Sequence, residues 1–276
     1  MSRPILERLF WSVGATAVVV QALLPLGWLL ALSLKRSADV GDGRFLPATV
    51  TLENYRAILH EEQFRAALVN SVGIASLATL LAVALATFAA YAVTRLDFPG
   101  RRLILAGSLA IAMFPPISVI GPLFDLWRTL GLFDTWPGLV IPYMTFTLPL
   151  AIWTLSAFFR DLPWDLDRAA RMDGATPFQA FRHVLAPLAA PGVFTAAILV
   201  FIFAWNDFLF AISLTSTDRA RTVPAALAFF SGESQFQQPT AHLAAASLVV
   251  TLPVVAVVLL CQRRIVAGLT AGAVKG

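Results

Sequence analysis

Charged residues and cysteine are scarce in this chain. Of its 276 residues, 13% are charged and 58% are hydrophobic, and the mean hydropathy is +0.78. Soluble domains are about a quarter charged and about half apolar, so this composition excludes a soluble domain and indicates an integral membrane protein. The single cysteine, Cys261, excludes an internal disulfide, and its place in an apolar run predicts a small buried side chain.

Lysine and histidine are also rare, which limits the chemistry open to the chain. Lys35 and Lys275 are the only lysines and neither follows a glycine, so the glycine-rich loop that binds nucleotide phosphates is absent. His60, His183 and His242 lie in separate segments without the spacing of a metal site. No nucleophile stands beside a base within an apolar run, so we predict no catalytic residue, no metal and no cofactor. The net charge of +4 is explained by basic residues flanking membrane spans rather than by nucleic-acid binding.

Long apolar runs take up most of the chain. A helix needs about 20 residues to cross a hydrocarbon layer about 30 Å thick. We therefore predict an all-α, polytopic membrane protein whose residues 1–276 form one transmembrane domain with six spans. The predicted spans are residues 9–34, 66–94, 103–126, 136–159, 192–214 and 240–261. The first run is longer than the core of a signal peptide and no A-x-A cleavage site follows it, so we predict that it is retained.

The loops between these spans differ in charge. Basic residues, among them Arg95, Arg101 and Arg160, outnumber acidic ones in the loops on the side of both termini. In the opposite loops acidic residues balance the basic ones. Short cytoplasmic loops keep an excess of Lys and Arg. Both termini and the loop 160–191 are therefore predicted to be cytoplasmic.

Proline interrupts several of the predicted spans. Pro115 and Pro116 lie in the third span, and Pro142 and Pro149 lie in the fourth. A broken helix in lipid must satisfy its freed carbonyl groups against protein or a watery cavity. Pro115 and Pro116 are therefore candidates for lining a translocation pathway. A kink that only improves helix packing is the alternative.

The basic loop 160–191 carries the start and stop signals of two short helices. Pro163 and Asp165 favour the start of the first helix, and Gly174 favours a left-handed end. The T-P-F-Q segment that begins at Thr176 has the pattern of a capping box at the start of the second. The first helix has too little apolar area to anchor itself in lipid. Its exposed face therefore suits either a groove in another protein or solvent.

The residues of this loop resemble a known motif. Ala169-Ala170, Asp173-Gly174-Ala175 and Pro187 follow the order of the EAA loop of ABC-importer permeases. In that family the loop is a coupling helix that docks onto the ATPase subunit. Arg168 stands where the family usually has Glu, and Ala186 stands where Leu usually precedes the proline. The resemblance implies ATPase-coupling roles for Arg168, Ala169, Ala170, Asp173, Gly174, Ala175 and Pro187.

The resemblance extends across nearly the whole chain. Residues 51–59, 70–102 and 205–215 and the C-terminal tail are similar to the second permease of carbohydrate importers, the maltose-permease G type, and are most similar to mycobacterial trehalose-importer permeases. This implies a non-catalytic subunit of an ATP-driven importer for a disaccharide such as trehalose or maltose, in the bacterial inner membrane. The implied partners are the lipid bilayer, a homologous second permease subunit, two ATPase subunits and an external sugar-binding protein.

Asp207 is the only ionisable residue well inside a predicted span. Trp205 and Asn206 precede it, and an aromatic face beside planar polar groups suits sugar recognition. These three residues are candidates for the translocation pathway, whereas a buried carboxylate bonded to a neighbouring helix is the structural alternative. Another function to consider is a secondary transporter in which Asp207 couples a proton or sodium ion to the substrate. Six spans without a visible inverted repeat disfavour it.

A polar loop, residues 215–241, precedes the last span. In the maltose-type family the equivalent loop reaches into the solute-binding protein. The resemblance therefore implies binding-protein contacts for Ser231, Gly232, Glu233 and Gln235. A plain connector between spans is the alternative.

Overall fold

The computed structural model describes residues 3–229 and 240–273, which form helices and connecting turns without a strand. The chain divides into two compact units. The first unit is Met1–Arg65 with Leu227–Leu252, and the second unit is Ala66–Ala226 with Pro253–Gly276. Four helices are long and apolar enough to cross a membrane, or up to six spans are present if each of two bent helix pairs is one span. The predicted all-α, polytopic fold is thus confirmed.

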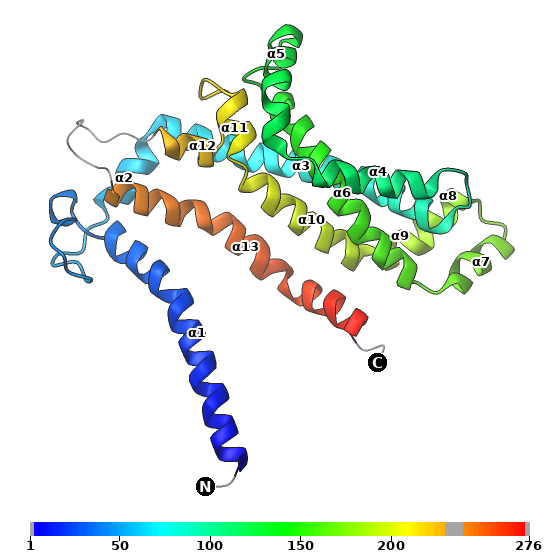
Figure 1. Cartoon of the computed structure of the whole chain (residues 1–276), viewed down its shortest axis with the longest axis horizontal. Helices are drawn as coiled ribbons and strands as arrows, with labels where there is room; N and C mark the ends of the chain where they lie inside the picture. The colour runs from blue at the N-terminus through cyan, green and yellow to red at the C-terminus, as the bar shows by residue number, and fades with distance from the viewer. Residues whose placement is uncertain (1–2, 230–239, 274–276) are drawn as a thin grey trace. The chain divides into compact units, whose positions relative to one another are not determined.

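The helices are labelled in Figure 1. The long ones are α1 (Arg3–Ser33), α3 (Glu62–Arg95), α6 (Trp136–Asp161) and α13 (Thr240–Ala273). One bent pair joins α4 (Arg101–Met113) to η2 (Pro116–Val119) and α5 (Ile120–Leu130). The other joins α8 (Pro177–Ala180), the π-helical turn η3 (Phe181–Leu185) and α9 (Ala186–Leu188) to α10 (Ala190–Trp205). The remaining short helices are η1 (Ser37–Asp39), α2 (Glu53–His60), α7 (Trp164–Met172), α11 (Leu209–Leu214) and α12 (Val223–Ala228).

Two of the predicted spans are not single straight helices. The third bends by 89° between α4 and the η2–α5 segment. Phe114 and Pro115 both precede a proline and both adopt extended backbone, because a following proline ring disfavours the helical conformation. The prediction of one helix over residues 192–214 was wrong, since α10 ends at Trp205 and α11 begins only at Leu209.

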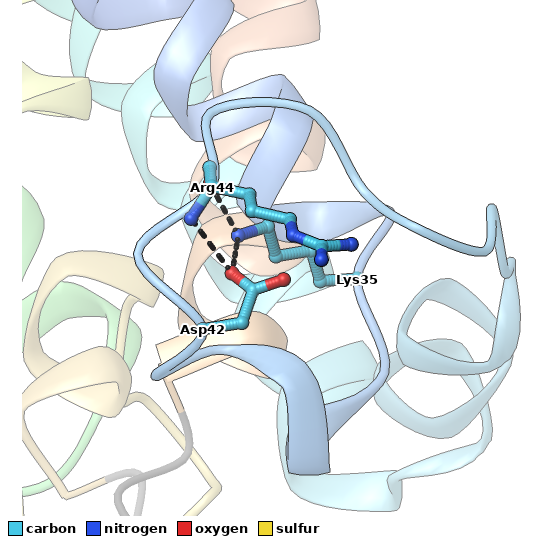
Figure 2. A network of polar contacts seen from close by, with 3 residues as sticks. All are labelled: Lys35, Asp42 and Arg44. Atoms are coloured by element: carbon cyan, nitrogen blue, oxygen red, sulfur yellow. Dashed lines mark hydrogen bonds and ion pairs between the residues drawn. The ribbon is translucent and has the colours of Figure 1, made fainter.

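A buried lysine holds the loop that follows α1 in the first unit. Figure 2 shows the Lys35 ammonium donating to Asp42 Oδ1 and to the carbonyl oxygen of Arg44, at 2.6 Å each. The backbone N–H of Arg44 donates to the same Asp42 oxygen at 3.0 Å. The Lys35 hydrogen bond, and then the Arg44 N–H, hold the pKa of Asp42 below its ordinary value of 3.8. Lys35 is only 1% exposed, and a buried charge of this kind is tolerated because it is paired and hydrogen-bonded.

The core of the second unit is formed by buried residues of α3, α6, η3 and α10. On α3, Ala82, Ala86 and Ala90 are fully buried and recur every four residues. Small residues at this spacing let neighbouring helix backbones approach closely. At the other end of α3, Gly73 lies against the indole of Trp136, where an added Cβ would come within 2.1 Å of the ring. Close helix packing therefore continues along much of α3.

Candidate functional site

The first loop helix, α7, ends in the left-handed turn that the sequence predicts. Gly174 has a φ of +85°. Its N–H donates to the carbonyl of Arg171 at 3.1 Å, and the N–H of Ala175 donates to the carbonyl of Ala170 at 3.0 Å. These two bonds define a Schellman motif, in which glycine is favoured because it adopts positive φ without a Cβ penalty. The local geometry at Gly174 is thus confirmed.

The second loop helix begins with the predicted capping box. The N–H of Gln179 donates to Thr176 Oγ1 at 3.3 Å, and the N–H of Thr176 donates to Gln179 Oε1 at 2.8 Å. The helix then passes through the π-helical turn η3 into α9. Figure 1 shows α7 and α8 following one another beyond the end of α6. The loop is therefore a built structure with defined ends.

One face of the α7–α9 loop is exposed to solvent. Exposed residues include Arg168, Ala169, Asp173, Gly174 and Pro187, whereas Ala170 and Ala175 are half-buried. Of the predicted coupling residues, Pro187 lies in α9, apart from the other six. Those six lie together on α7 and its end: Arg168, Ala169, Ala170, Asp173, Gly174 and Ala175. Two apolar side chains that the sequence analysis did not select are also exposed: Met172 by 85% and Phe178 by 58%.

The opposite side of the loop is anchored in the core of the second unit. Phe181 and Leu185 in η3 are buried. The Phe181 ring lies 4.8 Å from the ring of Tyr91 in α3 and 6.4 Å from that of Phe159 in α6, between centroids. These aromatic contacts attach the loop to the ends of two long helices.

The three pathway candidates that begin at Trp205 do not share one surface. Trp205 is buried and stacks on Phe201 at 5.6 Å between ring centroids. Asn206 is exposed, and its amide donates to the carbonyl of Ile202, one turn back, at 2.7 Å. An aromatic face and planar polar groups are both present, but they point into different surroundings. The structure therefore does not assemble them into one sugar-binding face.

Asp207 occupies the break between α10 and α11. Its Oδ2 accepts a hydrogen bond from the hydroxyl of Tyr143 at 2.8 Å and another from the N–H of Ala211 at 3.1 Å. Tyr143 belongs to α6 and is fully buried. The carboxylate thus satisfies a free N–H at the start of α11 while bonding to a neighbouring helix. This arrangement matches the structural alternative for Asp207.

Pro115 and Pro116 stand at the bend of the third span, beside an apolar hollow of about 460 Å³. The hollow is lined by α4, α5 and α6, with Phe114, Trp127 and Phe146 among its aromatic side chains and Thr145 as a polar one. Trp205, Asn206 and Asp207 are not among its lining residues. Pro115 and Pro116 are not among its lining residues either, so the hollow does not bring the two groups of pathway candidates together.

The predicted binding-protein contacts Ser231, Gly232, Glu233 and Gln235 lie outside the described residues. The loop that precedes them, residues 215–223, is held by a set of polar contacts that we call the Asn70 clasp. Asn70 Nδ2 donates to the carbonyls of Asp218 and Arg221 at 2.8 and 3.0 Å, and Trp136 Nε1 donates to Asn70 Oδ1 at 2.9 Å.

Asp134 completes the clasp. It adopts a positive φ of 58°, and its Oδ1 accepts from the N–H groups of Ser216 and Thr217 at 3.0 and 3.2 Å. The clasp thereby connects α3, the start of α6 and the loop 215–223. Its residues were not selected from the sequence, because an isolated Asn or Asp at a helix end carries no signal for partners so far away in the chain.

Comparison with known proteins places this architecture in a family. A model of the family described as "Binding-protein-dependent transport system inner membrane component" matches residues 82–269, which begin within α3 and end within α13. The match includes the whole α7–α9 loop. The chain belongs to this family of inner membrane transport components. The predicted resemblance to importer permeases is thus confirmed.

Two relatives resemble this transport component over almost its full length. The trehalose transport system permease protein SugB of Mycobacterium tuberculosis is 60% identical over 97% of each chain. The trehalose/maltose transport system permease protein MalG of Thermococcus litoralis is 41% identical over 100% of each chain. A solved chain of a bacterial ABC transporter involved in the import of the acidic polysaccharide alginate is 24% identical, with a TM-score of 0.79 over 95% of this chain and 98% of that one. At that identity the structural likeness shows a common fold.

Family membership gives no support to the alternative of a proton- or sodium-coupled secondary transporter. Asp207, the residue on which that alternative depended, has its carboxylate engaged by Tyr143 and by the backbone of α11. A simpler account of Asp207 is therefore available, in which it stabilises a broken helix.

Proposed function

We propose that this transport component is the non-catalytic permease subunit of an ATP-driven, binding-protein-dependent sugar importer. The observation that carries the proposal is the 60% identity, over 97% of both chains, to a trehalose transport permease. A second relative at 41% identity is described as a trehalose/maltose permease. The substrate class we propose is therefore a disaccharide such as trehalose or maltose.

In this proposal the α7–α9 loop docks onto an ATPase subunit through its exposed face. Support comes from the family, from the exposure of Arg168, Ala169 and Asp173, and from the rigid end that the Schellman motif gives to α7. Met172 is the most exposed large apolar side chain described in this loop, at 85%, and methionine is enriched in protein interfaces. We therefore assign Met172 to the docking surface, together with Arg168, Ala169, Ala170, Asp173, Gly174 and Ala175.

The rest of the assembly follows from the same family. We propose a bacterial inner membrane location with both termini and the α7–α9 loop in the cytoplasm, where ATP is available. The partners are a homologous second permease, two ATPase subunits and an external sugar-binding protein. The residues that contact the binding protein in this proposal are Ser231, Gly232, Glu233 and Gln235. Pro115, Pro116 and Asp207 shape the helices along the pathway rather than forming a single sugar site.

The proposal is tested by co-expressing the chain with its partner subunits and reconstituting the complex in liposomes. We expect labelled trehalose uptake that requires both ATP on the loop side and the binding protein on the other. An excess of unlabelled trehalose or maltose should compete for the carrier. Uptake that proceeds without ATP and follows an imposed proton gradient would show that the assignment is wrong.

Docking itself is tested by Met172→Ser. Loss of an apolar contact worth about 1.4 kcal/mol weakens binding about tenfold. We expect the purified complex to lose ATPase subunits while the permease stays in the membrane. Leu46→Ser is the matched control, because Leu46 is 70% exposed but lies in the loop after α1. Equal retention of ATPase subunits in both variants would show that Met172 is not part of the docking surface.

A further inference from the structure

The loop 215–223 lies at the opposite end of α3 from the α7–α9 loop. Asn70, near the start of α3, bonds to two carbonyl groups of the first loop. Tyr91, near the end of α3, donates its hydroxyl proton to the carbonyl of Pro177 in the second loop at 3.3 Å. At about 1.5 Å per residue, the rise from Asn70 to Tyr91 is about 31 Å, close to the thickness of a hydrocarbon layer. The two loops therefore lie on opposite sides of the membrane.

The backbone of the loop 215–223 is fixed by side chains from α3. Asn70 is 5% exposed, and its amide bonds to the carbonyls of Asp218 and Arg221, on either side of the loop's turn. The next residue, Ser71, accepts the N–H of Val223 at 2.7 Å and so holds the start of α12. A loop held in one conformation before its partner arrives lowers the entropic cost of binding.

Two charged side chains project from this fixed turn. Ala220 is fully buried, whereas Asp218 and Arg219 are exposed. Within residues 3–229 and 240–273, neither of these charged side chains has a hydrogen bond or an ion pair. Arg221, by contrast, donates to the carbonyl of Ser216. The turn therefore presents one acidic and one basic group from a positioned backbone.

We propose that Asp218 and Arg219 contact the external sugar-binding protein, and that the Asn70 clasp positions them for it. The proposal rests on the function proposed above, in which the α7–α9 loop is cytoplasmic and the loop 215–223 is therefore external. The partner surface that fits has a basic group opposite Asp218 and an acidic group opposite Arg219. An anionic lipid surface fits less well, because it attracts Arg219 but repels Asp218.

Arg219→Glu tests the contact in the complete complex in liposomes. The measurement is ATP hydrolysis as a function of the concentration of sugar-loaded binding protein. Exposed charges at an interface act mainly on association and on its salt dependence. We expect the half-saturating concentration to rise about fivefold at low salt, and less at high salt because the charges are screened. The rate at saturation should stay unchanged.

Arg128→Glu is the matched control. Arg128 is also an exposed arginine, but it lies in α5, which leads into Asp134 of the clasp. We expect the half-saturating concentration to change little. An equal rise in both variants would show a general attraction to the outer face, and no rise in Arg219→Glu would show that the contact is absent. A rise that disappears in liposomes without anionic lipid would make a lipid headgroup the partner of Arg219. Each of these results overturns the proposal.

Asn70→Asp tests the positioning role of the clasp. The variant replaces the donor Nδ2 by an acceptor oxygen, so two carbonyls lose their bonds while the indole of Trp136 keeps its acceptor. Binding must then order the loop. We expect the half-saturating concentration to rise about tenfold, with unchanged hydrolysis both without binding protein and at saturation. A clasp that only stabilises the fold would lower the Tm and leave that concentration unchanged.

A double variant shows whether the clasp acts through Arg219. In Asn70→Asp combined with Arg219→Glu, the half-saturating concentration should rise by less than the product of the two single factors. A full product would mean independent effects and would refute the positioning role. If Asn70→Asp fails to assemble, Ser71→Ala replaces it, since it removes only the acceptor of the Val223 N–H; we expect a smaller rise, and none would refute the role. Hydrolysis and uptake that ignore the binding protein in the wild type would refute the proposed function itself.

Discussion

Replacement of Gly174 by valine alters the backbone of the loop without crowding it. A Cβ at this position would meet nothing within 4 Å, so steric overlap contributes nothing. The cost comes from the φ of +85°, since left-handed backbone costs an L-residue roughly 1–2 kcal/mol. A penalty of that size shifts an equilibrium about 5- to 30-fold. The population of the native Schellman conformation, relative to other conformations of this turn, should fall by that factor. The angle between α7 and α8 should change with it.

The expected result is a permease that inserts normally and docks poorly. Gly174 is exposed and lies outside the spans, so membrane levels should stay near those of the wild type. ATPase subunits should be partly lost from the purified complex, and sugar uptake should fall about tenfold, within the shift estimated above. Gly100→Val is the control, because Gly100 has a φ of +92° and equally open surroundings at the start of α4. If Gly174→Val binds ATPase and transports sugar as well as Gly100→Val does, the loop is a solvated connector.

Three further predictions concern other parts of the chain. Asp207→Ala leaves the Tyr143 hydroxyl and the start of α11 without an acceptor, so we expect a loss of about 1–3 kcal/mol, seen as a lower Tm of the purified complex. Asp207→Asn should lose less stability. In neither variant should sugar uptake depend on a proton gradient. Gly73→Ala forces a methyl group onto the Trp136 ring and should destabilise by about 1–3 kcal/mol, whereas an unchanged Tm would mean that the ring shifts freely. The pKa of Asp42 is lowered by Lys35, so its stabilising effect is complete above pH 3.8 and is lost as the pH falls through the lowered pKa; hydrogen exchange in residues 36–44 should accelerate there, and in Asp42→Asn it should be fast at every pH.

Features with a local cause were predictable from the sequence. Apolar run length predicted the all-α membrane fold, because a chain in lipid must satisfy its backbone within helices. The left-handed Gly174 and the capping box at Thr176 were predictable because a few adjacent residues determine them. The bend after Phe114 has an equally local cause in two consecutive prolines.

Features that depend on packing were not predictable in this way. At the break between α10 and α11, Asp207 accepts a hydrogen bond from Tyr143, which lies on another helix. Asp167 and Arg95 look like ordinary charges near helix ends, and only the packed structure shows that both are buried. Met172 lies in a helix of small and charged residues, so its exposure follows from which side of α7 the core covers.

The long helix α3 carries the Asn70 clasp near one end and Arg95 at the other. Unlike α1, α6 and α13, it has no internal proline. At a rise of about 1.5 Å per residue, Asn70 and Arg95 are attached about 37 Å apart on one continuous helix. A ligand that fixes the loop 215–223 and a partner that binds the α7–α9 loop then act on the same helix, because Tyr91 of α3 contacts Pro177 and Phe181 of that loop. Thermodynamic reciprocity requires that if the first changes the affinity for the second, the second changes the affinity for the first by the same factor.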